Sequence, residues 1–86
     1  MKNQYKMDYK KIEDKVLKIL FKEKAPEDLD GTLVDYGIDS LTALEAFLEL
    51  EHTFDTSLTE LEEDFPEHNQ RITPRRIINY LASKFS

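Results

Sequence analysis

Ser40 is the residue of this chain whose type and setting could do chemistry, because it lies between Asp39 and Leu41 where a helical pattern begins. A catalytic serine needs a base within hydrogen-bond reach and donors for an oxyanion. His52 would lie twelve residues along the same helix, about 18 Å away at 1.5 Å per residue. No Gly-x-Ser-x-Gly motif surrounds the serine. Hydrolysis catalysed by this chain alone is therefore disfavoured.

A serine at the start of a helix has a different use. Its hydroxyl lies beside backbone N–H groups that have no intrahelical partner and at the positive end of the helix dipole, where a phosphate ester is stabilised. The simpler alternative is that Ser40 only caps its helix. Asp39 could cap equally well, which would leave Ser40 free as the first helical residue. Both interpretations stay open at this point.

Length and composition limit the function classes. A chain of 86 residues makes one domain, predicted here to span residues 1–86, and buries roughly 60–65% of its unfolded surface. The chain contains no cysteine, so neither a disulfide framework nor a thiolate metal site is expected. We find no secretion signal at the N-terminus and no apolar run approaching the roughly 20 residues of a membrane span. The expected compartment is the cytoplasm, without membrane insertion.

Charge is segregated along the chain. Residues 25–70 contain fourteen Asp and Glu and no Lys or Arg, whereas the flanking segments contain all twelve basic residues and only four acidic ones. The net charge of −6 therefore hides a strongly acidic middle and basic ends. Such an acidic surface repels nucleic acid and anionic lipid and attracts basic partners. We interpret the acidic middle as the side that faces a partner protein, and we expect the protein to be a monomer.

Apolar residues recur at helical spacing in four segments, with no pattern typical of strands. Asp8 precedes the first, Pro66 ends the third, and Thr73 with Pro74 starts the last. The sequence predicts an all-α fold, a small four-helix bundle with three main helices and one short helix. Residues 26–39 are expected to form an ordered loop packed on the domain. The expected helices span about residues 8–24, 40–53, 57–65 and 74–85.

The helix at 40–53 is apolar on two sides. One stripe is the expected core face, and it comprises Ala43, Ala46, Phe47, Leu50 and Phe54. A second stripe, which we call the leucine ridge, comprises Leu41, Leu44 and Leu48, and the flanking acids are Glu45, Glu49 and Glu51. Fully buried helices do not carry three glutamates in seven residues. The leucine ridge is therefore expected to be partly exposed and to form a docking surface.

The run Tyr36-Gly37-Ile38-Asp39-Ser40-Leu41, followed by Leu44, Glu45, Leu48, Glu49 and Phe54, resembles the attachment region of the acyl carrier and peptidyl carrier protein family. The resemblance extends over nearly the whole chain. The segment from Thr73 to Ile78 is somewhat more similar to D-alanyl carrier proteins, and the subclass is unresolved.

The resemblance implies that a phosphopantetheinyl transferase joins 4′-phosphopantetheine from coenzyme A to Ser40, with Asp39 and Leu41 completing the motif. It implies a non-enzymatic carrier that holds acyl or aminoacyl groups as thioesters. Other implied partners are a loading ligase and downstream acyl-processing enzymes of fatty-acid, polyketide, nonribosomal-peptide or related biosynthesis. The residues expected to bind partners are Leu41, Leu44, Glu45, Leu48, Glu49 and Glu51.

Other charged and metal-binding residue types give weaker signals. His52 and His68 have no second ligand at a metal spacing, so no metal site is expected. Arg71, Arg75 and Arg76 are too few to indicate nucleic-acid binding and are expected to pair with acidic residues or with a helix end. The rival to the carrier is a non-enzymatic acidic helical module that binds a basic partner, with Ser40 only a cap or a phosphorylation site.

Overall fold

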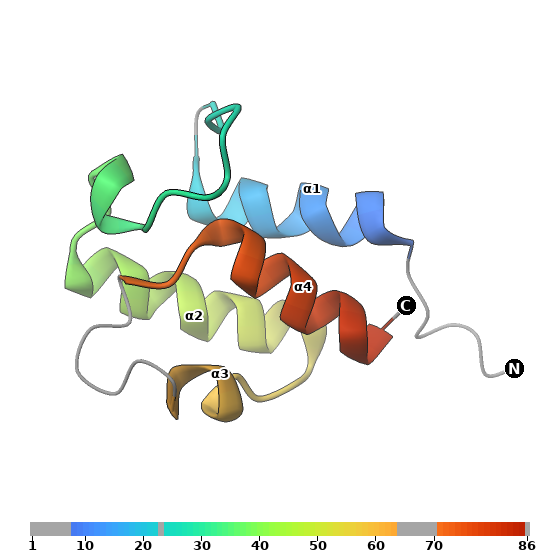
Figure 1. Ribbon diagram of the computed structural model, residues 1–86. Helices are drawn as coiled ribbons and strands as arrows, with labels where there is room; N and C mark the ends of the chain where they lie inside the picture. The colour runs from blue at the N-terminus through green and yellow to red at the C-terminus, as the bar shows by residue number, and fades with distance from the viewer. Residues whose placement is uncertain (1–7, 23, 64–70, 86) are drawn as a thin grey trace, which may run out of the picture.

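The computed structural model describes residues 8–22, 24–63 and 71–85, and these form four α-helices without a strand. They are α1 (Tyr9–Leu20), α2 (Ser40–Phe54), α3 (Thr59–Glu63) and α4 (Pro74–Phe85), with a short 3₁₀ helix η2 (Val34–Tyr36) before α2. In Figure 1, α1 runs opposite in direction to α2 and α4, and the short α3 lies below α2. The predicted small helical bundle is confirmed.

Helix α1 is amphipathic and packs against both α2 and α4. Asp8 caps it, because its side chain accepts a hydrogen bond from the Lys11 N–H. Its buried stripe is Ile12, Val16 and Leu20. The apolar side chains of all the helices and of the connecting loop then form one core. Among the described residues, no polar or charged side chain is buried in that core.

Helix α1 ends earlier than the expected residue 24. Phe21 takes extended backbone angles, with φ −125° and ψ 103°, which cannot continue a helix. Its ring packs edge-to-face on the ring of Tyr36, with the centroids 5.6 Å apart. This contact joins residues fifteen positions apart, so the helical spacing of the sequence could not show it. The helix therefore ends at Leu20, four residues before the expected end.

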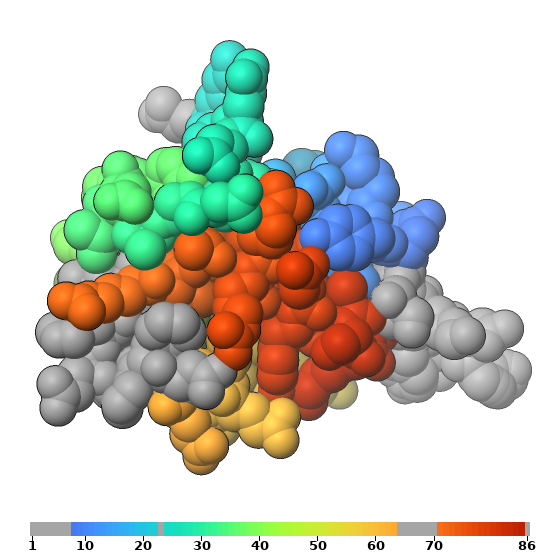
Figure 2. Space-filling view, in the orientation of Figure 1, coloured from blue at the N-terminus to red at the C-terminus, as the bar shows by residue number. Residues whose placement is uncertain are grey.

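Residues 26–39 form a loop that packs on the domain, as predicted. Leu29 and Leu33 are buried. The Leu33 N–H donates to the Ile72 carbonyl over 3.0 Å, and the Arg75 N–H donates to the Leu29 carbonyl over 3.2 Å. Figure 2 shows the loop and the segment before α4 as one continuous surface. The loop that leads to Ser40 is thus held by the chain that enters α4.

Side chains reinforce this attachment. The Arg75 guanidinium donates from Nε to Asp30 Oδ1 over 2.9 Å, and the expected pairing of this arginine with an acidic residue is confirmed. The Tyr36 hydroxyl accepts from the Gly31 N–H and donates to the Asp28 carbonyl. A local network therefore ties the part of the loop before η2 both to η2 itself and to the first turn of α4.

The start of α4 agrees with the sequence signals. Helix α4 starts at Pro74, and Thr73 Oγ1 accepts from the Arg76 N–H over 3.0 Å. Helix α3 starts at Thr59, two residues after the expected residue 57, and its expected end at Phe65 and Pro66 lies outside the described residues. Leu58 and Leu61 of this region are buried in the core.

We find no helix among the described residues that is long and apolar enough to cross a membrane.

Candidate functional site

Ser40 is the first residue of α2, and Asp39 caps the helix. Asp39 Oδ1 accepts from the Thr42 N–H over 2.8 Å, and the Asp39 carbonyl accepts from the Ala43 N–H over 2.9 Å. Ser40 itself is exposed, and its hydroxyl has no hydrogen-bond partner within the described parts of the chain. Of the two interpretations left open by the sequence, the structure favours the one in which Asp39 caps and the serine hydroxyl is free.

The Asp39 carboxylate is kept ionised by its capping role. The hydrogen bond from the Thr42 backbone N–H is the main cause that lowers the pKa of Asp39 below its usual value, and the Thr42 side chain adds to it. A carboxylate fixed beside the helix N-terminus interacts favourably with the helix dipole. Because it accepts the capping hydrogen bond, the adjacent serine hydroxyl takes no part in capping. The acid therefore positions the serine without competing for its oxygen.

Gly37 sets the direction in which the chain enters α2. Its φ of 81° and ψ of 15° are left-handed, and its N–H donates to the Val34 carbonyl over 2.9 Å. A Cβ here would meet no atom within 4 Å, so the requirement for glycine comes from the backbone angle and not from space. The following residue, Ile38, is buried and donates its N–H to the Leu33 carbonyl. Together they hold Asp39 and Ser40 at a fixed place on the surface.

The two apolar stripes of α2 have opposite environments. The predicted core face is buried, from Ala43 through Phe54. The leucine ridge is exposed: Leu41 is 64% exposed, Leu44 46% and Leu48 57%. These are three of the largest apolar exposures among the described residues, and the sequence did not indicate the other prominent one, Val34 at 49%. The ridge thus lies on the surface beside Ser40, as its flanking glutamates predicted.

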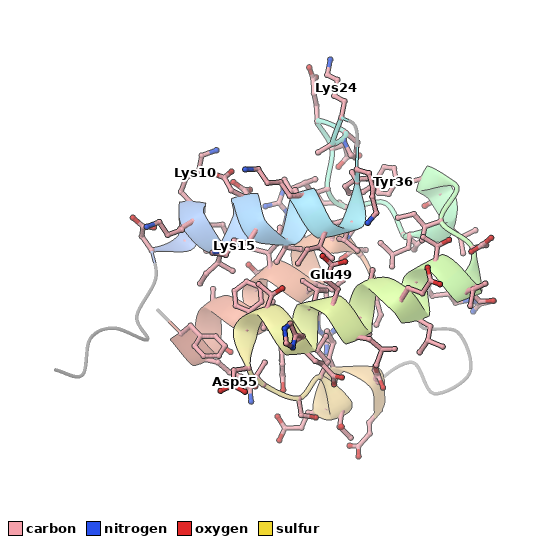
Figure 3. All side chains as sticks on the ribbon, turned by 180° about the vertical axis from the view of Figure 1, so that it is seen from behind. Lys10, Lys15, Lys24, Tyr36, Glu49 and Asp55 are labelled. Atoms are coloured by element: carbon pink, nitrogen blue, oxygen red, sulfur yellow. The ribbon has the colours of Figure 1, made fainter. Side chains whose placement is uncertain are left out.

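The three glutamates flanking the ridge do not form one ring. Glu45 and Glu49 are exposed and line a cavity between α1 and α2. Glu51 is half-buried on the other side of the ridge, where its Oε2 accepts from the Leu58 N–H over 2.8 Å. Figure 3 shows Glu49 between α2 and α1. The expectation that Glu51 contacts a partner stays a prediction, and the structure gives this residue a structural task that the sequence did not indicate.

Glu51 also affects a residue of α3. Partial burial, and then the charge of Glu51, raises the pKa of Glu62 above its usual value. Two acids therefore lie close together where α2 meets α3. The Glu51 hydrogen bond holds Leu58, the residue before α3, and so places the start of this helix on the side of α2 away from the cavity.

His52 does not lie near Ser40 in the part of the chain that the structure describes. His52 lies on the exposed surface of α2, three turns beyond Ser40, and His68 lies outside the described residues. The part of the chain that the structure describes contains no cluster of three metal-binding side chains. The site is therefore an exposed hydroxyl at a fixed helix start, with an apolar ridge and acidic side chains beside it.

Comparison with protein families gives one match. A family model described as "phosphopantetheine attachment site" matches residues 14–81, which include all of α2 and its entry loop. Comparisons with curated proteins and with solved structures give no match.

Proposed function

The chain belongs to the phosphopantetheine attachment site family, and on this premise we propose that Ser40 is the residue to which 4′-phosphopantetheine is joined. Members of this family serve other enzymes as carriers and bear the cofactor covalently. One observation at the start of α2 supports the assignment: Asp39 accepts the capping hydrogen bond, and the exposed Ser40 hydroxyl has no hydrogen-bond partner among the described residues.

The residues at this position fit the group. A phosphodiester on Ser40 would lie at the N-terminus of a fifteen-residue helix, where backbone N–H groups have no intrahelical acceptor and the dipole is positive. Attachment would form a bond between Ser40 Oγ and the phosphorus next to pantetheine in coenzyme A. It would break the pyrophosphate bond, release adenosine 3′,5′-bisphosphate and remove the hydroxyl proton. When bound, the group supplies a thiol that can hold an acyl or aminoacyl cargo as a thioester.

The leucine ridge and the two exposed glutamates support docking to partner enzymes. Exposed leucines bordered by carboxylates match the apolar centre and charged rim of a protein interface. The proposed partners are a phosphopantetheinyl transferase, a loading ligase and acyl-processing enzymes with basic docking surfaces. The cargo is an acyl or aminoacyl group of fatty-acid, polyketide, nonribosomal-peptide or related biosynthesis, and the unit that carries it is one domain spanning residues 1–86.

Intact mass tests the attachment residue. The protein is incubated with coenzyme A and a transferase of broad specificity, and wild type is compared with Ser40→Ala and with Ser57→Ala, an exposed serine before α3. We expect a gain of one phosphopantetheine in wild type and Ser57→Ala, and none in Ser40→Ala. An unmodified wild type contradicts the assignment and favours the acidic binding module, whereas a modified Ser40→Ala contradicts it by placing the attachment at another residue.

The docking surface is tested by the rate of the same modification. Glu45→Lys and Leu44→Ala are both on exposed positions of α2, so their helix content is expected to stay unchanged. We expect each to slow modification at low salt, by charge reversal in the first case and by loss of apolar contact in the second. Rates equal to the wild-type rate would contradict a docking role for this surface.

A further inference from the structure

Arg71 is an exposed arginine just before α4, and the packing of the fold does not explain it. The sequence predicts that it pairs with an acidic residue or a helix end, as Arg75 does with Asp30. Within the described parts of the chain, however, the Arg71 side chain has no ion pair and no hydrogen bond. Arg71 is also the first basic residue after the acidic stretch of residues 25–70.

Backbone hydrogen bonds connect the position of Arg71 to the segment that ends at Ser40. The Ile72 carbonyl accepts from the Leu33 N–H over 3.0 Å, and the Leu33 carbonyl accepts from the Ile38 N–H over 3.0 Å. Ile38 in turn lies two residues before Ser40. Figure 1 shows the chain that enters α4 and the start of α2 at the same end of the molecule. Arg71 therefore lies beside the approach to the serine.

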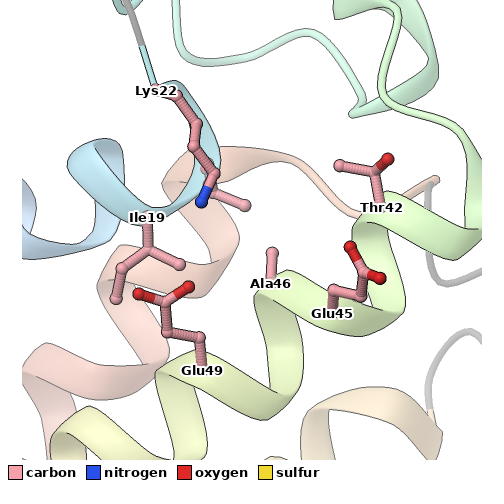
Figure 4. A pocket seen from close by; sticks show the side chains of 7 residues that line it. Ile19, Lys22, Thr42, Glu45, Ala46 and Glu49 are labelled. Atoms are coloured by element: carbon pink, nitrogen blue, oxygen red, sulfur yellow. The ribbon is translucent and has the colours of Figure 1, made fainter.

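Helix geometry gives the side of α2 on which Ser40 lies. Glu51 is eleven residues further on, about three full turns, so it shares a face with Ser40. Glu51 accepts the hydrogen bond of Leu58, the residue before α3. Thr42 points to the opposite side, into the hollow that Lys22 reaches from the early end of α1 (Figure 4). Ser40 therefore faces the side of α3, the helix that precedes Arg71 in the chain, and Lys22 lies on the other side.

A phosphodiester on Ser40 would add a negative charge to a site that is already acidic. The capping hydrogen bond keeps the neighbouring Asp39 carboxylate ionised, and residues 25–70 contain no Lys or Arg. The positive end of α2 carries only about half an elementary charge, and Asp39 already interacts with it. A cation from outside this stretch would therefore stabilise the modified serine.

We propose that Arg71 pairs with the phosphodiester at Ser40 once the group is attached. This inference rests on the proposed function and assigns to its site a residue outside α2 and the loop before it. A guanidinium can donate two parallel hydrogen bonds to phosphate oxygens, whereas an ammonium acts as a compact point charge. The pairing would hold the phosphate end of the group on the α3 side of α2 and leave the leucine ridge open to partner enzymes.

Thermal unfolding of the unmodified and the modified protein tests the pairing. Arg71 would meet the phosphodiester only after attachment, so the change in Tm on modification should depend on this residue. We expect that change to be about 2–4 °C less favourable in Arg71→Gln than in wild type at low salt, with a smaller difference at high salt. Equal changes in the two proteins would overturn the proposal.

Two further variants separate a local contact from a general charge effect. Lys24→Gln removes the same charge at the far tip of the loop, which Figure 3 shows, and should respond to modification as wild type does. Arg71→Lys keeps the charge and should respond between wild type and Arg71→Gln. If Lys24→Gln responds like Arg71→Gln, only net charge matters. If Arg71→Lys responds like Arg71→Gln, the charge of this residue is not the cause, and either result overturns the pairing.

Nitrogen-15 NMR of the full chain observes the contact directly. We expect the Arg71 Nε–H signal to move and to exchange more slowly with water after modification. The Arg75 Nε–H signal is the internal control, because this group already donates to Asp30, and it should stay unchanged. Intact mass is measured on the same samples. A protein that gains mass at Ser40 with an unchanged Arg71 signal refutes the pairing and leaves the attachment intact, whereas no gain at Ser40 refutes both.

Discussion

The two apolar faces of α2 consist of similar residues, but one is buried and the other is exposed to solvent. Phe47 and Leu50 of the core face are fully buried, whereas Leu48, next to Phe47 in the chain, is 57% exposed. Hydrophobicity alone cannot distinguish these faces, because each repeats at three and four residues. The difference lies in their neighbours: glutamates border the ridge, and other helices cover the core face. The same kind of side chain thus stabilises the fold on one face and stays available to partners on the other.

The largest effect that tests this comparison is on stability. Replacing Phe47 by Ala removes a fully buried ring, so we expect the free energy of unfolding to fall by about 3–5 kcal/mol. Leu48→Ala is the matched variant from the exposed face, and its change should stay within about 0.5 kcal/mol. Urea denaturation followed by circular dichroism measures both. Comparable losses in the two variants would mean that the ridge is part of the core.

A smaller effect on stability should distinguish Glu51 from Glu49, which lie on opposite sides of the leucine ridge. Glu51→Ala removes the acceptor of the Leu58 N–H at the start of α3, and we expect it to destabilise the protein by about 1 kcal/mol. Glu49→Ala, on the cavity side, should leave the free energy of unfolding almost unchanged and slow transferase modification instead. Urea midpoints and modification rates are measured on the same two samples. If Glu49→Ala proves the more destabilising, the division between a structural and a docking glutamate is wrong.

The smallest expected effect on stability is that of Asp39, which caps the helix that carries both faces. Its pKa is lowered in the folded state, so its ionised form stabilises the fold at pH values above the usual pKa of 3.8, and this contribution is lost as the pH falls through the folded value. Asn at this position also caps but does not titrate. We expect the urea midpoints of wild type and Asp39→Asn to differ by a constant amount above about pH 5 and to draw together below it. Parallel curves down to acid pH would show that the cap charge contributes nothing.

Much of this arrangement follows from local signals. Proline and threonine mark the start of α4, and the glutamates beside the leucines predict an exposed face. Local signals could not show the early end of α1, because it depends on the contact between Phe21 and Tyr36, nor the place of Lys22 that results from it. Local signals also could not show the role of Glu51. Its carboxylate accepts a hydrogen bond from Leu58, and that contact exists only because the chain turns back after α2. Each of these features depends on a contact between segments that the local sequence pattern does not show.

The hydrogen bonds between the loop and the chain entering α4 have a consequence for the order of events in the cell. Leu33 is anchored by Ile72, and Leu29 by Arg75, so the support of the loop before Ser40 is synthesised more than thirty residues after the serine itself. A chain still being translated can expose Ser40 long before Ile72 leaves the ribosome. We therefore expect the serine to reach its final geometry only after Ile72 and Arg75 have left the ribosome, so that chains terminated before Ile72 would be poor substrates for the proposed modification.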